Sequence, residues 1–242
     1  MKKIYVFLLM LLSCSTEQNP VNKPIIAVYA AWKYPEFGLN NIRWELFSHI
    51  AIASIYPRED GTLESSIVDP FIGQLVDNAR SHGKQVILSV GGSGDGSKAF
   101  RQIMADESLS KKFVNNLIEY AKRHQVDGID IDWEYWTFQN EFNQGGNDPK
   151  ESQYLVDLLK LLRGSILNSM LLTVDIAPGD WMGSQYKREI QDYVDYVNLM
   201  AFDFTGAWET SQIAHHSDYQ TFIKSIKHTL KKGFNKNKLF KL

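Results

Sequence analysis

Acidic side chains stand at alternate positions of one short segment, and this spacing is the strongest chemical signal in the sequence. The segment reads Asp127-Gly-Ile-Asp130-Ile-Asp132-Trp-Glu134. Because side chains alternate between the two faces of a β-strand, Asp130, Asp132 and Glu134 share one face of the strand that this segment predicts. The isoleucines and the tryptophan between them occupy the other face, which can pack against helices.

Acids gathered on a buried face are costly, because like charges repel and each uncompensated buried charge destabilises a fold. Such groups usually share protons and have shifted pKa values, which suits acid–base catalysis. Two other structures fit the same residues: a solvated edge strand, and a calcium site built from the carboxylate oxygens. The apolar residues on the opposite face favour burial on both sides, and therefore the catalytic interpretation.

Short apolar runs alternate with amphipathic segments along the rest of the chain. We expect strands at residues 25–32, 49–55 and 85–90, at the carboxylate segment, at 171–176 and 193–202, and the start of another at 238–242. Helices are expected over residues 68–81, 108–124, 149–168 and 218–232. This alternation predicts a parallel sheet, as a closed (β/α) barrel or a doubly wound sheet. Both folds place chemistry at the carboxyl ends of strands.

The carboxylate segment fits D-x-x-D-x-D-x-E and resembles the signature of family 18 glycoside hydrolases, the family of chitinases and endo-β-N-acetylglucosaminidases. Two further segments are similar to motifs of that family. The run Ser89-Val-Gly-Gly92 resembles its S-x-G-G strand, and residues 197–204 resemble its M-x-Y-D strand, with Phe202 where tyrosine is usual. The likeness runs from about Pro24 to the end of the chain.

The resemblance implies a (β/α)8 TIM-type barrel for residues 24–242. A typical barrel of this kind needs about 250 residues, and our count supplies strands one to six and only the start of the seventh. We therefore expect an incomplete, C-terminally truncated catalytic barrel. The alternative is that a strand lies uncounted between residues 32 and 48.

The resemblance also implies a reaction and its main residues. Family 18 enzymes cleave with retention, using the acetamido group of the substrate as the nucleophile. Glu134 would be the general acid and later the base. Asp132 would bind the acetamide N–H, and Asp130 would share a proton with Asp132. Asp127, which stands at odd spacing, is expected to be structural.

Further positions match the family less closely. Tyr29 and Ser89 would hydrogen-bond the buried Asp130, with core packing as the alternative. Asp203, paired with Met200, would contact the sugar.

Phe202 departs from the family pattern, because the usual tyrosine donates a hydroxyl to the acetamide oxygen. Losing one such donor commonly costs about 10²–10³ in rate, so we expect low activity.

Sugar rings stack on exposed aromatic side chains, and tryptophans follow several of the expected strands. Trp208, in Thr205-Gly-Ala-Trp208-Glu, is the most similar to the family, and Trp32 is a second candidate. Trp136 and Trp181 stand at comparable places, and for each of these residues packing is the alternative.

The first residues predict export. Lys2-Lys3 and an apolar run to Leu12 are typical of a signal peptide at residues 1–13. Cys14 follows Leu-Leu-Ser, which resembles the lipobox of bacterial lipoproteins, so residues 14–23 would be a flexible tether. We expect a lipoprotein of the bacterial cell envelope, or a secreted protein if the signal is simply cleaved. Cys14 is the only cysteine, so the chain forms no intramolecular disulfide.

Composition limits the partners. The chain has 26 basic and 28 acidic residues and a net charge of −2, which argues against nucleic acid. His215-His216 lacks a carboxylate-rich motif at ligand spacing, so we expect no metal and no cofactor. We expect a monomer whose partner is an N-acetylglucosamine-containing polysaccharide or glycan. Alternatives are an endo-β-N-acetylglucosaminidase acting on N-glycan cores and a weakly active or non-catalytic chitin-binding, lectin-like protein.

Overall fold

A curved parallel sheet surrounded by helices forms the body of the protein. The structure is a computed structural model, and it describes residues 24–135, 149–178, 185–207, 211 and 213–241. In the sheet the parallel strands follow the order β1-β2-β4-β5-β6-β7-β8, and β3 pairs antiparallel with β2. Cys14, Trp136, Trp181 and Trp208, and with them the predicted signal peptide and tether, lie outside the described residues.

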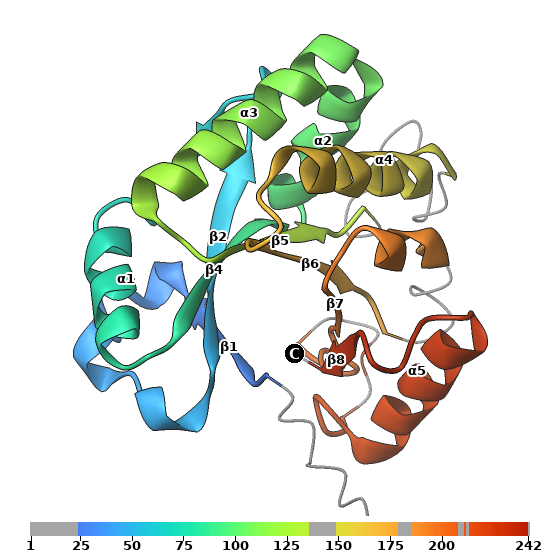
Figure 1. The fold of residues 1–242 in the computed structure, drawn as a ribbon. Coiled ribbons are helices and arrows are strands. Elements are labelled where there is room, and N and C mark those ends of the chain that lie inside the picture. Colours follow the sequence, from blue (N-terminus) through green and yellow to red (C-terminus); the bar gives the residue numbers. More distant parts are fainter. Residues whose placement is uncertain (1–23, 136–148, 179–184, 208–210, 212, 242) are drawn as a thin grey trace, which may run out of the picture.

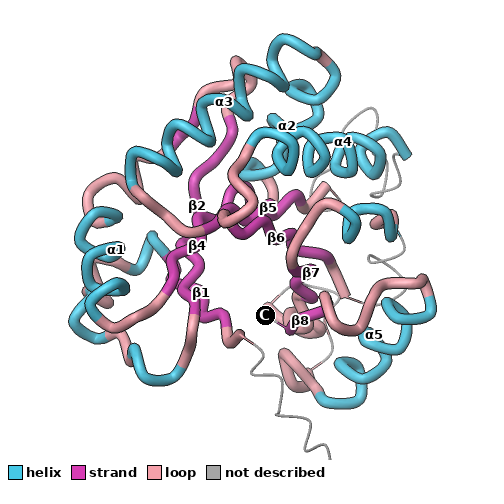
Figure 2. The backbone as a smooth tube through the Cα atoms, viewed as in Figure 1, coloured by secondary structure: helices cyan, strands magenta, loops and turns pink. Residues whose placement is uncertain are grey.

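The strands lie close to where the apolar runs predicted them. They are β1 (Ile26–Ala30), β2 (His49–Pro57), β3 (Leu63–Glu64), β4 (Gln85–Gly92), β5 (Gly128–Trp133), β6 (Leu171–Ile176), β7 (Tyr196–Leu199) and β8 (Leu239–Lys241). Figures 1 and 2 show that the sheet curls around a central axis and that the helices lie on its outer side. This arrangement is that of an incomplete (β/α)8 barrel, as the resemblance implied.

The helices connect successive strands of the sheet. They are α1 (Ile72–Ser81), α2 (Asp95–Ala105), α3 (Glu107–His124), α4 (Pro149–Ser165) and α5 (Tyr219–Lys231). Helix α2 was not predicted from the sequence, because its start is rich in glycine and follows directly on β4. Between residues 32 and 48 the chain forms short 3-10 helices rather than a strand, so the alternative strand count is wrong.

The sheet is open between its outermost strands. Among the described residues β1 pairs only with β2, and β8 pairs only with β7. As a consequence apolar side chains of β1 and its flank remain in contact with solvent, with Ile25 60% and Val28 53% exposed. No helix in the described part of the chain combines the length and the apolar character needed to cross a membrane.

Polar contacts fix the helices to the sheet. The side chain of Asp106 caps α3 by accepting from the Ser108 and Leu109 backbone amides. Arg163, on α4, donates to the Asp195 carboxylate at 2.6 Å. The same Asp195 oxygen accepts from the backbone N–H of Leu172, the second residue of β6. One ion pair thus ties α4 to the segments that carry β6 and β7.

The backbones of β4 and β5 approach each other closely where the sequence has Gly91. This residue pairs with Asp132 and has a φ of +113°, a conformation that other residues rarely adopt. A Cβ atom there would lie 2.2 Å from the Asp132 carbonyl oxygen and 2.9 Å from the Phe100 ring. The glycine therefore lets β5 hold its second carboxylate beside β4.

We expect Gly91→Ala to lower the free energy of unfolding by at least about 3 kcal/mol, since it adds backbone strain to a clash with a buried strand. Gly73→Ala is the matched control, because a Cβ on Gly73, in α1, meets nothing within 4 Å. It should be neutral or stabilising by up to about 1 kcal/mol. Urea unfolding of both variants checks this, and equal midpoints would contradict the close approach.

Candidate active site

The predicted carboxylates gather in a cavity at the carboxyl ends of the strands. The cavity has a volume of about 190 Å³ and is lined by side chains of β1, β2, β4, β5, β6 and β7 and of the segments that follow β1, β5 and β7. They are Ile26, Val28, Trp32, Ala51, Ala53, Ile87, Ser89, Asp130, Asp132, Glu134, Thr173, Asp175, Asn198, Met200 and Phe202. None of these carries a positive charge. Within the described residues no cluster of His, Cys, Asp or Glu could hold a metal ion.

Asp130 lies deepest among the carboxylates, and its side chain is held by hydrogen-bond donors. Ser89 Oγ donates to its Oδ2 at 3.0 Å, as predicted for Ser89. Its Oδ1 accepts from the Thr173 hydroxyl and, at 3.1 Å, from Asn198 Nδ2. Burial raises the pKa of Asp130, while the bonds from Thr173 and Ser89 oppose that shift.

Asp132 has little hydrogen-bonding support. Its Oδ1 is buried and has no hydrogen-bond partner among the described residues. Burial, and after it the charges of Glu134 and Asp130, raises the pKa of Asp132 well above its ordinary value. Asp132 therefore holds its proton more tightly than an ordinary aspartic acid, and its Oδ1 is available to a ligand in the cavity.

Glu134 stands at the outer end of the row. Burial, and after it the charge of Asp203, raises the pKa of Glu134 from 4.5 to about 7. Its backbone N–H donates to Ser97 Oγ at 2.7 Å, and that hydroxyl donates to the Gly92 carbonyl oxygen at 2.6 Å. Ser97 lies in the first turn of α2, so the helix that the sequence did not predict fixes the backbone of the predicted acid.

Asp203 lies on the segment after β7 and is not among the residues that line the cavity. Its backbone is in the left-handed region, with a φ of +54°. Its Oδ1 lies 3.0 Å from Nδ1 of His216, and both side chains are exposed. The imidazole also stacks on the Phe202 ring, with 6.0 Å between centroids. Asp203 thus acts on Glu134 through its charge from a solvated position.

The predicted role of Tyr29 is wrong. Its hydroxyl donates to the Phe37 carbonyl oxygen at 2.6 Å, and its ring packs edge-on against Phe71. Ile26 and Val28 of the same strand line the cavity, so the alternation of side chains points Tyr29 to the outer face. Tyr29 therefore cannot hydrogen-bond Asp130, and the packing alternative holds.

Three more residues singled out from the sequence line the cavity. Met200 and Phe202 line the cavity wall, and Trp32 lines it while remaining 53% exposed. Asp127 faces away from the cavity and accepts a hydrogen bond from the Val86 backbone amide at 2.8 Å, a structural role as expected. Trp208 lies outside the described residues.

Sequence reasoning missed the polar residues that β6 and β7 contribute. Thr173 and Asp175 are buried and line the cavity together with Asn198. Their signal was present in the sequence, because Thr173 and Asp175 are polar at alternate positions of an otherwise apolar strand. The same spacing had identified the acids of β5.

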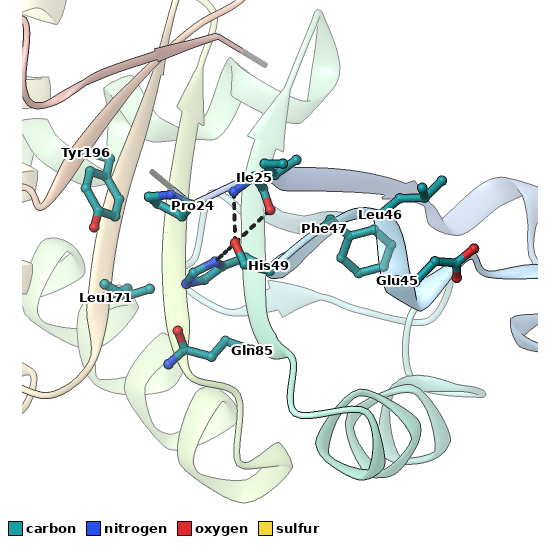
Figure 3. Close-up of a pocket in the computed structure, with 10 residues that line it drawn as sticks. Pro24, Ile25, Glu45, Leu46, Phe47, His49, Gln85, Leu171 and Tyr196 are labelled. Carbon is teal, nitrogen blue, oxygen red and sulfur yellow. Dashed lines mark hydrogen bonds between the residues drawn. The ribbon is translucent and has the colours of Figure 1, made fainter. Parts of the chain in front are cut away.

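A second pocket lies at the opposite end of the strands and has a different character (Figure 3). It is lined by the first residues of β2, β4, β6 and β7, namely His49, Gln85, Leu171 and Tyr196. Glu45 is the only acid in its described lining, and burial lowers the pKa of His49. The described lining of this pocket contains no paired carboxylates, so we place the candidate chemistry at the carboxyl ends of the strands.

Comparison with known families agrees with this geometry. The model for "Glycosyl hydrolases family 18" matches residues 25–240. The chain belongs to glycosyl hydrolase family 18. Among curated family 18 relatives, "Probable chitinase 2" of Drosophila melanogaster is 31% identical over 219 residues, which cover 81% of this chain and 44% of that protein. "Chitinase-3-like protein 2" of Homo sapiens is 31% identical over 144 residues, covering 55% of this chain and 34% of that protein.

Solved structures show the same fold. A chitinase from Bacteroides thetaiotaomicron superimposes with a TM-score of 0.76 at 24% identity, covering 90% of this chain and 65% of that one. A family 18 chitinase from Cycas revoluta in complex with (GlcNAc)3 gives a TM-score of 0.77 at 23% identity, covering 90% and 68%. The chain spans less than half the length of the curated relatives named above.

The raised pKa of Glu134 predicts a pH dependence of stability. The folded protein binds this proton more tightly than the unfolded chain, so the contribution is fully present below pH 4.5 and is lost as the pH rises through about 7. Relative to Glu134→Gln, the unaltered protein should lose about 1–3 kcal/mol of unfolding free energy over this range. Denaturant unfolding of both proteins at several pH values measures it, and parallel stability curves would contradict the shift.

Proposed function

We propose that the protein hydrolyses β-1,4 bonds of N-acetylglucosamine polymers, meaning chitin or a related glycan, by a retaining, substrate-assisted reaction. The observation that carries the proposal is the row of acids in a cavity whose described lining contains no cation. Burial raises the pKa of Glu134, at the outer end of this row, to about 7. A general acid–base group works best when its pKa lies near the working pH. The (GlcNAc)3 named with the Cycas revoluta structure supports this class of substrate.

In the proposed reaction Glu134 first donates its proton to the glycosidic oxygen, and the bond from that oxygen to the sugar C1 breaks. The acetamide oxygen of the same sugar forms a bond to C1 and gives a cyclic oxazolinium ion. Asp132, whose Oδ1 lacks a partner among the described residues, would hydrogen-bond the acetamide N–H and stabilise the positive charge that develops. Ionised Glu134 then takes a proton from water as the water oxygen attacks C1. The bond from C1 to the acetamide oxygen breaks, which restores the acetamido group and completes hydrolysis with retention.

Two alternatives use the same cavity. An endo-β-N-acetylglucosaminidase acting on N-glycan cores would need the same acids and differ only in the glycan it accepts. A chitin-binding protein without turnover is favoured by Phe202, because a phenyl ring on the cavity wall offers no hydroxyl to an acetamide oxygen. Analysis of the products formed from chitin oligosaccharides and from N-glycopeptides distinguishes a chitinase from an endo-β-N-acetylglucosaminidase. Any turnover excludes the non-catalytic binding protein.

Glu134→Gln should abolish hydrolysis of a fluorogenic chitobioside, by at least about 10²-fold, because the amide cannot transfer a proton. The matched control is Glu119→Gln, which makes the same chemical change at an exposed position of α3 and should retain activity. Turnover in Glu134→Gln equal to that of the control would contradict the assignment. Binding of chitin oligosaccharides with no turnover in the unaltered protein would support the lectin-like alternative.

Phe202→Tyr should raise kcat by about 10-fold or more, because it adds a hydroxyl donor to the wall of a preorganised site. Phe37→Tyr is the control, since Phe37 is 46% exposed and is not among the residues that line the cavity. Rates on a soluble chitin oligomer measure the effect. An unchanged or lower rate in Phe202→Tyr would count against a missing donor at this position.

We further propose that the protein is exported and carries a lipid anchor on Cys14. The lipobox-like segment before this residue supports the proposal. Labelled palmitate should enter the unaltered protein and not Cys14→Ala, and release of unmodified protein into the medium would refute the anchor.

A further inference from the structure

We propose that Asp175 is a neutral carboxylic acid that donates a hydrogen bond to Asp130 and so determines which of the buried acids carries the negative charge. Asp175 would be a positioning residue for the reaction proposed above, and the inference rests on that proposal for its functional meaning. Its structural part, the resident proton, is testable without any turnover.

The strand register places Asp175 next to the deepest acid. On β6, Thr173 pairs with Asp130, and two residues further along Asp175 pairs with Asn198 of β7. Side chains two positions apart share a face, so both residues of β6 project into the cavity with Asp130. Asp175 is only 6% exposed and Asp130 only 2%. Solvent therefore contributes little to stabilising a charge on either acid.

The hydrogen-bond donors are distributed unequally between Asp130 and Asp175. Asp130 accepts from Ser89, Thr173 and Asn198. Asp175 accepts from Asn198 alone among the described residues, at 2.9 Å. Since donors stabilise the ionised form of a carboxyl group, Asp130 is the better place for a negative charge and Asp175 the better place for a proton. A hydrogen bond from Asp175 is also among the contacts that favour ionised Asp130.

The charges around Asp175 favour the same assignment. From β5 it faces Asp130, Asp132 and Glu134, and burial together with these acids raises the pKa of Asp175 well above its ordinary value. From β7 it faces the neutral Asn198. The buried phenol of Tyr186, after β6, also interacts with Asp175 and is neutral. In the described lining of the cavity no cation is present to hold a second anion.

A proton on Asp175 has a consequence for the proposed acid and base. An ionised Asp175 would add a further negative charge beside Asp132 and Glu134, and like charges raise the pKa of a carboxyl group. The pKa of Glu134 would then be raised further, and Glu134 would be a weaker general acid. With Asp175 neutral, the fixed charge stays on Asp130, and Glu134 can exchange its proton near the pH at which a general acid–base group works.

Infrared difference spectroscopy tests the proton directly on the full chain, labelled with ¹³C at the aspartate carboxyl groups. The spectrum of the unaltered protein minus Asp175→Asn, in mildly alkaline buffer, should contain the C=O stretch of a protonated carboxylic acid that shifts with the label. The control is Asp157→Asn at an exposed position of α4, which should remove a carboxylate band instead. A carboxylate band lost in Asp175→Asn would overturn the proposal even if the protein proved inactive.

The rates supply the second readout. Asp175→Asn keeps a neutral side chain with an N–H donor, whereas Asp175→Ala removes the donor to a charged group. We expect kcat to be lower in Asp175→Ala than in Asp175→Asn by about 10-fold or more. The basic limb of the pH–rate profile should keep its midpoint in Asp175→Asn. A midpoint that falls by about one pH unit would mean that a negative charge was removed, and it would overturn the proposal.

If neither variant folds, as judged by circular dichroism, the unaltered protein still gives an answer. Its ¹³C-labelled aspartate carboxyl groups can be titrated by NMR. One buried aspartate besides Asp132 should stay protonated above neutral pH, and titration of every aspartate other than Asp132 below that range would overturn the proposal.

Discussion

The structure depends on one electrostatic constraint: several carboxyl groups occupy a buried cavity whose described lining contains no cation. Desolvation of a carboxylate is expensive, and repulsion between neighbouring carboxylates adds to the cost. Protons are then the means of neutralisation. The acids differ in how many donors each receives, from the well-supported Asp130 to Asp132, whose Oδ1 has no partner among the described residues. Unequal support is what assigns unequal roles to chemically similar side chains.

The scaffold makes this arrangement compatible with a folded core. Residues of β5 alternate between acids that face the cavity and apolar side chains such as Ile131 and Trp133, which are fully buried on the other face. Gly91 lets β4 approach β5 beside Asp132, and Ser97 of α2 fixes the backbone of Glu134. The packing of the apolar layer therefore offsets the free-energy cost of burying several acids together, as is usual at functional sites.

The periodicity of polar and apolar residues predicted most of the strands and the acidic face of β5. It failed where it could not show which side chains of a strand face the cavity. The acids of β5 could be placed on one face because three of them stand at alternate positions with apolar residues between them. On β1 the residues on both faces are apolar or aromatic, so the sequence could not say which face Tyr29 occupies, and resemblance supplied the wrong answer. Asp175 carried the same alternate-position signal as the acids of β5, but it is the only acid in its strand. Contacts such as Ser97 with Glu134 join segments 37 residues apart, and no local pattern reveals them.

Burial among other acids should leave Glu134 protonated up to neutral pH, and the proposed acid–base role requires it. Titration of its side-chain carboxyl ¹³C resonance by NMR, with the signal assigned by its loss in Glu134→Gln, measures this directly. We expect a midpoint near pH 7. A midpoint close to the ordinary value of 4.5 would contradict it.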